Sequence, residues 1–217
     1  MNLNETIIKK SREFAQLKMA ALRPSHGWDH AERVADTALR ICAKERKADR
    51  FIVETASILH DIARHEEDES GGKICHAEAG SRIAYDFLVR EGLDRERADH
   101  VRKCILTHRY RNEIHPESLE AKIVFDADKI DSLGAVGIGR AFLFSGEVGA
   151  RLHNHDIDVT ATEAYSREDT AYREFMVKLR FLKKSMLTRA GKKIARARHR
   201  YMKKFFRRLA GEIAGKS

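Results

Sequence analysis

The chain has 217 residues, of which 42% are apolar and 35% charged, and its 42 Lys and Arg against 33 Asp and Glu give a net charge of +9. No window approaches the roughly 20 uncharged apolar residues of a membrane span, and the segment MNLNETIIKKSREFAQ lacks the basic-then-apolar order of a signal peptide. The three cysteines have no CxxC spacing, which argues against a disulfide framework or a zinc knuckle, so we expect a soluble, cytoplasmic protein with reduced thiols.

Helix-favouring residues dominate the chain and only two prolines interrupt it, which predicts an all-α fold. We expect one domain over residues 1–217, with a core at about residues 20–145 and a helical extension at about residues 168–210. Short loops or turns are predicted to separate the core helices. In chain order the predicted core helices are Asn4 to about Leu22, Trp28 to about Lys47, a helix capped by Asp49 that leads into His60, His76 to about Glu91, Asp94 to about His108, and a helix that opens at Ser118 and continues through an apolar run to Gly139.

The stretch HEEDESGG, residues 65–72, breaks the helical pattern and is predicted to be an exposed loop. A second polar loop is predicted from about Ser145 to Arg167, and two basic helices follow, joined near residues 188–191. Fifteen of the Lys and Arg residues lie between Phe175 and Ser217 with a single acid, so the positive charge belongs to this end of the chain.

We expect these basic helices to bury an apolar face and to expose their charges to solvent. Electrostatic steering of polyanionic substrates is one alternative explanation of the charge. Nucleic-acid binding is another, and it is not favoured because the sequence has no recognised binding motif.

Histidine and aspartate side chains interrupt the apolar runs of the predicted core. Burying an imidazole or a carboxylate without a partner costs several kcal/mol, and a bound metal ion is one source of compensation. The spacing of these residues fits no zinc finger, so a site would be assembled from several helices, as in helical bundles. The residues concerned are His30 in SHGWDH, His60 and Asp61 in ILHD, His108 in CILTH, and Asp126 and Asp128 in IVFDADKI.

The motifs WDHAERV, ILHDI, HAEAG, ILTH and DADKID occur in this order along the chain. Together they resemble the HD-domain superfamily of metal-dependent phosphohydrolases, and in particular its stand-alone nucleotide-hydrolase branch. The late stretch TRAGKKIARARHRYM is similar to the C-terminal helices of that branch, so the resemblance covers nearly the whole chain. It implies an HD-domain helical bundle with basic C-terminal helices.

The resemblance also implies a set of metal ligands. The last ligand is an aspartate of the pair Asp126 and Asp128, and Asp128 is preferred, with Asp126 as its alternative. Members with two metals carry further histidines between the HD pair and this aspartate, in which case Asp61 would bridge the ions. The implied ligands are His30, His60, Asp61, Asp128 and, for a second ion, His76 and His108.

Such ligands imply one or two divalent ions per chain, chosen from Mn²⁺, Fe²⁺, Co²⁺, Ni²⁺, Zn²⁺ or Mg²⁺. The implied reaction is attack of a metal-bound hydroxide on a phosphoester or pyrophosphate bond, in a nucleotide or another phosphorylated small molecule. Asp61 would act by holding the metal, and Arg33 is the first candidate to stabilise charge on the phosphoryl oxygens. Glu66 or Glu67 is a candidate general acid or water-positioning group, and the weaker candidate cations are Arg64, Lys73, Arg109 and Lys129.

Two alternatives to this reaction stay open. The same site could hydrolyse a phosphodiester such as a cyclic nucleotide, or the fold could serve as a nucleic-acid-binding or regulatory module without turnover. The sequence makes no prediction of the oligomeric state. The remaining histidines considered are expected to be ordinary core or surface residues, namely His65, His100, His115, His153, His155 and His199.

Overall fold

The structure is a computed structural model and describes residues 2–109 and 114–216. Its regular elements are helices, with no strand in these two ranges, which confirms the all-α prediction. The chain divides into two compact units, Met1–Asp128 and Lys129–Ser217, and we describe each by itself. The extent of the predicted single domain stays a prediction. Within the described ranges, no helix combines the length and apolarity that a membrane crossing requires.

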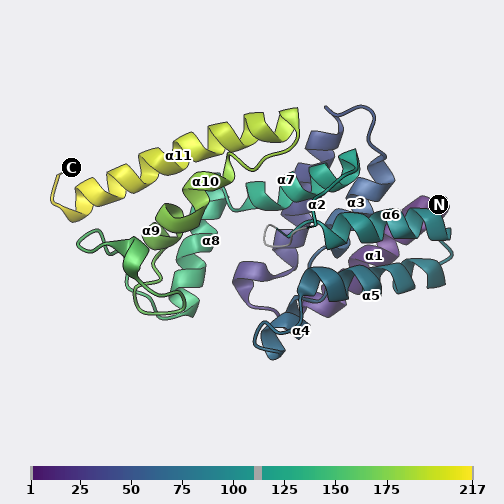
Figure 1. The fold of residues 1–217 in the computed structure, drawn as a ribbon, viewed down its shortest axis with the longest axis horizontal. Helices are drawn as coiled ribbons and strands as arrows, with labels where there is room; N and C mark the ends of the chain where they lie inside the picture. The colour runs from purple at the N-terminus through teal and green to yellow at the C-terminus, as the bar shows by residue number, and fades with distance from the viewer. Residues whose placement is uncertain (1, 110–113, 217) are drawn as a thin grey trace. The chain divides into compact units, whose positions relative to one another are not determined.

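Most helices of the first unit follow one another with short connections (Figure 1). Asp49 and Asp94 begin two of them by accepting hydrogen bonds from backbone N–H groups of the first turn, as the sequence predicted. The helices are α1 (Leu3–Met19), α2 (Trp28–Cys42), α3 (Arg50–Leu59), α4 (Arg64–Glu69), α5 (His76–Arg90), α6 (Arg95–Leu106) and α7 (Leu119–Asp131), inside which the first unit ends.

Helix α3 lies at the centre of the first unit. It packs against α1, α2 and α6, and from Phe51 to Leu59 its side chains are buried apart from that of Glu54. A helix that is apolar on nearly all sides is stable only inside a protein, which explains the composition FIVETASIL. Because α3 is held from several sides, the His60 and Asp61 that follow it are placed rigidly.

Two helical hairpins bring pairs of histidines together. Helices α2 and α3 pack on each other, as do α5 and α6, and the connection within each pair is short. A short connection makes neighbouring helices antiparallel, so the start of the first helix lies beside the end of the second. His30 and His76 lie near the starts of α2 and α5, while His60 and His108 follow the ends of α3 and α6.

Two predictions about local structure are wrong. The segment HEEDESGG is not simply a loop, because residues 64–69 form α4, in which Arg64 pairs with Glu67 one turn later and Glu67 is buried. The predicted long sixth helix also ends early, at Asp131, and a new helix begins at Gly134. Gly134 has φ of 78°, a left-handed conformation that continues no helix and that favours glycine.

The second unit contains α8 (Gly134–Glu147), the 3₁₀ turn η2 (Val159–Ala161), α9 (Ala171–Glu174), the π-helical segment η3 (Phe175–Leu179), α10 (Arg180–Leu182) and the long helix α11 (Arg189–Ile213). Thr188 caps α11 through its side chain. Helix α11 packs against α8 (Figure 1). It buries Ala195, Met202 and Phe206 while most of its Lys and Arg side chains are exposed, in agreement with the predicted amphipathic pattern.

Candidate metal centre

His30, His60 and Asp128 lie together in the first unit. The Nε2 atoms of the two histidines are 3.3 Å apart. Oδ1 of Asp128 lies 3.4 Å from Nε2 of His30 and 3.9 Å from Nε2 of His60. Both rings are buried, so three ligand atoms from α2, the end of α3 and α7 face one small volume.

His76 and His108 form a second pair at the open end of the other hairpin. Their Nε2 atoms are 3.2 Å apart, and both rings are buried. His108 also joins His60 and Asp61 in a group whose ligand atoms lie within 4.8 Å of one another. The four histidines that the sequence pattern singled out are therefore brought into one cluster.

The carboxylate of Asp61 lies between the two histidine pairs. Its Oδ2 atom is 3.8 Å from Nε2 of His30 and 3.6 Å from Nε2 of His60. Its Oδ1 atom is 3.3 Å from Nε2 of His76 and 3.5 Å from Nε2 of His108. Each oxygen of the Asp61 carboxylate thus faces a different histidine pair.

Three of the rings are oriented through their Nδ1 atoms. In His60 this atom lies 2.8 Å from the carbonyl oxygen of Ser57, and in His108 it lies 2.6 Å from that of Ile105. A carbonyl oxygen only accepts hydrogen bonds, so Nδ1 carries the proton and Nε2 presents its lone pair. Nδ1 of His76 is held in the same way by Glu67, at 2.6 Å.

The protonation state of these rings favours the binding of a cation between them. Burial lowers the pKa of His60 to about 4 and that of His76 to about 3, so both rings are neutral at neutral pH. With the Nδ1 atoms protonated, the Nε2 atoms of His76 and His108 direct lone pairs at each other and have no proton to share. A divalent ion resolves this conflict, and neutral imidazole with carboxylate is a donor set suited to it. The residues present therefore fit a metal ion.

Asp61 and Glu67 are both anionic in this environment. Although burial alone raises the pKa of Asp61, the Arg64 guanidinium and the neighbouring histidines hold it well below its usual value. Nη2 of Arg64 lies 3.3 and 3.4 Å from the two oxygens of Asp61. Burial likewise acts to raise the pKa of Glu67, but His76 and two arginines, Arg64 and Arg109, lower it overall.

Comparison with known proteins gives the family. Residues 27–133 match the HD domain. The uncharacterized protein YpgQ of Bacillus subtilis is 39% identical over 194 residues, which are 88% of this chain and 85% of YpgQ. The chain belongs to the HD-domain family. The predicted resemblance to the HD-domain superfamily is thereby confirmed.

Solved structures support the same assignment for this HD-domain protein. The crystal structure of B. subtilis YpgQ in complex with ADP has 32% sequence identity and a TM-score of 0.76, over 97% of both chains. An HD-superfamily hydrolase from Bacillus thuringiensis has 29% identity and a TM-score of 0.76, over 97% of this chain and 98% of its own. The fold is that of HD-superfamily hydrolases.

The other predicted site residues of the HD domain are not among the clustered histidine and aspartate side chains. Nη1 of Arg33, one turn after His30 on α2, lies 2.5 Å from the carboxylate of Asp29. Glu66 points to α1, where its Oε1 atom lies 3.2 Å from Nζ of Lys18. Lys73 is exposed, and Lys129 is the first residue of the second unit. A catalytic role for any of these residues stays a prediction.

Arg64 and Arg109, two candidate phosphate-binding cations, both contact carboxylates of the HD domain, and a contact of either with phosphate stays a prediction. Arg64 contacts Asp61 and Glu67, and Nη1 of Arg109 lies 2.6 Å from Oε1 of Glu67. The orienting role of Glu67, between His76 and these two arginines, was not predicted from the sequence. The spacing of Arg64 and Glu67, three residues apart, was the available signal, but it required α4 to be recognised as a helix.

Proposed function

We propose that this protein is a metal-dependent phosphohydrolase with two divalent ions held around Asp61. One ion would be held by His30, His60, Asp128 and one oxygen of Asp61. The other would be held by His76, His108 and the second oxygen of Asp61. The observation that carries the proposal is the division of the Asp61 oxygens between the two histidine pairs.

The ions would supply Lewis acidity and would lower the pKa of a coordinated water toward neutrality. A hydroxide nucleophile for the hydrolysis of phosphate esters would then be available at neutral pH. The protein's own part is to hold the ligand atoms in place. Ser57, Ile105 and Glu67 fix three of the rings through Nδ1, and Arg64 holds the Asp61 carboxylate between the pairs. Arg33 is proposed to bind the phosphate of the substrate after leaving Asp29.

We propose a nucleotide as the substrate. The related protein YpgQ binds ADP in its crystal structure and is similar to this chain over nearly its whole length. The phosphates of a nucleotide would supply the phosphorus atom that is attacked at a dinuclear centre. Two cations would stabilise the negative charge of the phosphoryl group during its displacement. The bond to be cleaved is a phosphoester or a pyrophosphate.

The test is a turnover screen on the purified protein. Nucleoside mono-, di- and triphosphates and phosphodiesters are each incubated with Mn²⁺, Co²⁺, Ni²⁺ or Mg²⁺, and products are separated by chromatography. We expect metal-dependent release of phosphate or pyrophosphate from a nucleotide, abolished by chelator. Selective cleavage of diesters would replace the proposed substrate class. Equal product from the wild type and Asp61→Ala would overturn the assignment as a hydrolase.

A further inference from the structure

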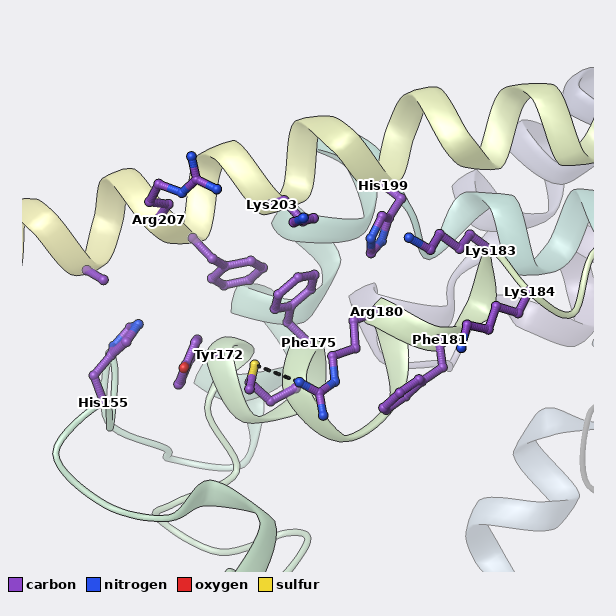
Figure 2. A pocket seen from close by; sticks show the side chains of 13 residues that line it. His155, Tyr172, Phe175, Arg180, Phe181, Lys183, Lys184, His199, Lys203 and Arg207 are labelled. Atoms are coloured by element: carbon purple, nitrogen blue, oxygen red, sulfur yellow. Dashed lines mark hydrogen bonds between the residues drawn. The ribbon is translucent and has the colours of Figure 1, made fainter.

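The second unit contains a cavity of its own. It has a volume of about 510 Å³ and lies between α11 on one side and α9, η3 and α10 on the other (Figure 2). A volume of this size suits a small organic ligand, for which pockets of roughly 300–1,000 Å³ are usual. All of its lining residues belong to the second unit, so none of them is a proposed metal ligand.

One part of the lining is aromatic. The ring of Tyr172 stacks on His155 with centroids 3.7 Å apart, and Phe175 stacks on Phe206 at 4.6 Å. The Phe181 ring is 47% exposed, with the guanidinium of Arg180 placed over it at 4.6 Å from the centroid. Flat rings in a partly open cavity are suited to stacking on a planar ligand.

The rest of the lining is strongly basic. Arg180, Lys183, Lys184, Lys203 and Arg207 all line the cavity, and no acidic residue is among its lining side chains. None of these five cations forms an ion pair with a carboxylate in the described part of the chain. In the first unit, by contrast, the arginines around the metal centre are paired with Asp or Glu. Five uncompensated charges around one cavity favour a ligand with several negative charges.

Buried polar atoms of the cavity also lack partners. His199 is only 4% exposed and points from α11 toward the opposite wall (Figure 2), yet its Nδ1 atom has no hydrogen-bond partner among the described residues. Arg180 and His155 are partly buried residues, but Nε of Arg180 and both ring nitrogens of His155 are buried atoms that also have no hydrogen-bond partner among the described residues. Burial of such groups is costly unless something binds them. Burial, together with Lys183 and Lys203, lowers the pKa of His199, so a neutral ring is available for a neutral hydrogen-bonding group.

We propose that this cavity binds a nucleotide, with its base against the aromatic wall and its phosphates on the lysines and arginines. Among small anions, a nucleotide combines a planar aromatic part, polar ring edges and several negative charges, which match the three features of the lining. An inorganic polyphosphate would use only the cations, and a nucleoside only the rings. The π-helical segment η3, which supplies Phe175 and Met176 to the wall, is consistent with a binding role, because π-helical turns occur frequently at functional sites.

The test measures binding to the full-length protein in excess EDTA, so that no metal ion links a nucleotide to the metal centre. Equilibrium dialysis or calorimetry is carried out with ATP, adenosine, inorganic triphosphate and a single-stranded oligoadenylate. We expect ATP to bind with one equivalent per chain and at least about tenfold more tightly than adenosine or triphosphate, because each lacks one half of the contacts. Absence of ATP binding, equal affinity for triphosphate, or tighter binding of the oligonucleotide would each overturn the proposal.

Charge reversal locates the site. The double variant Lys203→Glu with Arg207→Glu should weaken ATP binding by about tenfold or more, because two phosphate contacts are replaced by repulsion. The matched control is Lys193→Glu with Lys204→Glu, which reverses two exposed charges of the same helix outside the cavity lining. Equal weakening by both pairs would mean that the helix attracts anions only through its overall charge.

A third variant tests whether the base of the nucleotide stacks on the aromatic wall, and it removes no charge. Phe181→Ala truncates a ring that is half exposed, so the fold is expected to be kept, and circular dichroism checks this for every variant. Affinity for ATP should fall while affinity for triphosphate stays the same, because only the base contacts the rings. A Phe181→Ala protein that is folded and binds ATP as the wild type does would exclude stacking on this ring.

Discussion

Glu67 and His76 are joined by a contact of 2.6 Å between Oε2 and Nδ1, although nine residues separate them in the chain. The contact orients His76 so that its Nε2 atom faces Asp61. Arg64 and Arg109 hold the same carboxylate from other directions. The short helix α4 therefore positions a ligand of the proposed second ion.

Glu67→Gln should weaken binding of one of the two ions, because the amide neither balances the two arginines nor strengthens the imidazole as a ligand. Loss of such an orienting partner typically lowers metal affinity by about 10–100-fold. Titration with Mn²⁺ or Co²⁺ measures the effect. The neighbouring Glu66→Gln is the matched control and should bind both ions normally, since Glu66 contacts Lys18. Similar losses in the two variants would refute the orienting role of Glu67.

Asp61→Ala should lower turnover by orders of magnitude, because it removes the carboxylate that both proposed ions share. Bound metal should fall with it. Steady-state kinetics on the nucleotide identified by the screen, with elemental analysis of the same sample, checks both effects. Asp36→Ala, at an exposed position of α2, is the control for a lost surface carboxylate and should retain full activity.

His76→Ala and His108→Ala should each reduce the metal content from two ions per chain toward one. Each change removes a ligand from one side of Asp61 and leaves His30, His60 and Asp128 in place. Elemental analysis of protein purified without chelator gives the number directly. A wild-type protein with one ion, which survives both changes, would show that the centre is mononuclear.

Arg33→Ala should keep the bound metal while kcat or substrate affinity falls, because the proposed contact is with phosphate rather than with an ion. The matched control is Arg40→Ala, two turns further along α2 and exposed. Kinetic constants and metal content of both variants are compared with those of the wild type. Loss of metal from Arg33→Ala would instead indicate a structural role in the centre.

The metal-free protein should lose stability when the pH is lowered from about 7.5 to about 5. His60 and His76 have pKa values of about 4 and about 3 in the folded state, whereas an unfolded chain takes up these protons near pH 6.5. Their contribution to stability is therefore complete above about pH 6.5 and is lost as the pH falls toward the folded values. Thermal melts of chelator-treated protein followed by circular dichroism check this.

Replacing both rings should flatten that pH dependence. The double variant His60→Gln, His76→Gln has no such groups to protonate, so its melting temperature should vary less across the same range, whatever its absolute value. His65→Gln, at a histidine with a side chain that is 45% exposed, is the control and should keep the steep dependence. An unchanged slope in the double variant would assign the acid sensitivity to other groups.

The helices and the motifs that carry the candidate ligands could be recognised from the sequence, because they depend on local patterns. Caps such as Asp49 and Asp94, and the amphipathic pattern of α11, are set within a few turns of helix. Short connections make neighbouring helices antiparallel, so even the pairing of His30 with His60 follows from local rules and from the resemblance.

The tertiary structure alone decided the contacts of residues that are one or two positions apart in the sequence. Asp126 and Asp128 are about 200° apart around a helix, and the packing of α7 places Asp128 at 3.4 Å from His30. Glu66 and Glu67 are about 100° apart, and the position of α4 turns Glu67 toward His76. Likewise, the cavity of the second unit depends on how α11 lies over η3, which no periodicity in the sequence encodes. Periodicity determines which face of a helix is buried, whereas the contacts of a single side chain depend on the rotation and crossing of whole helices.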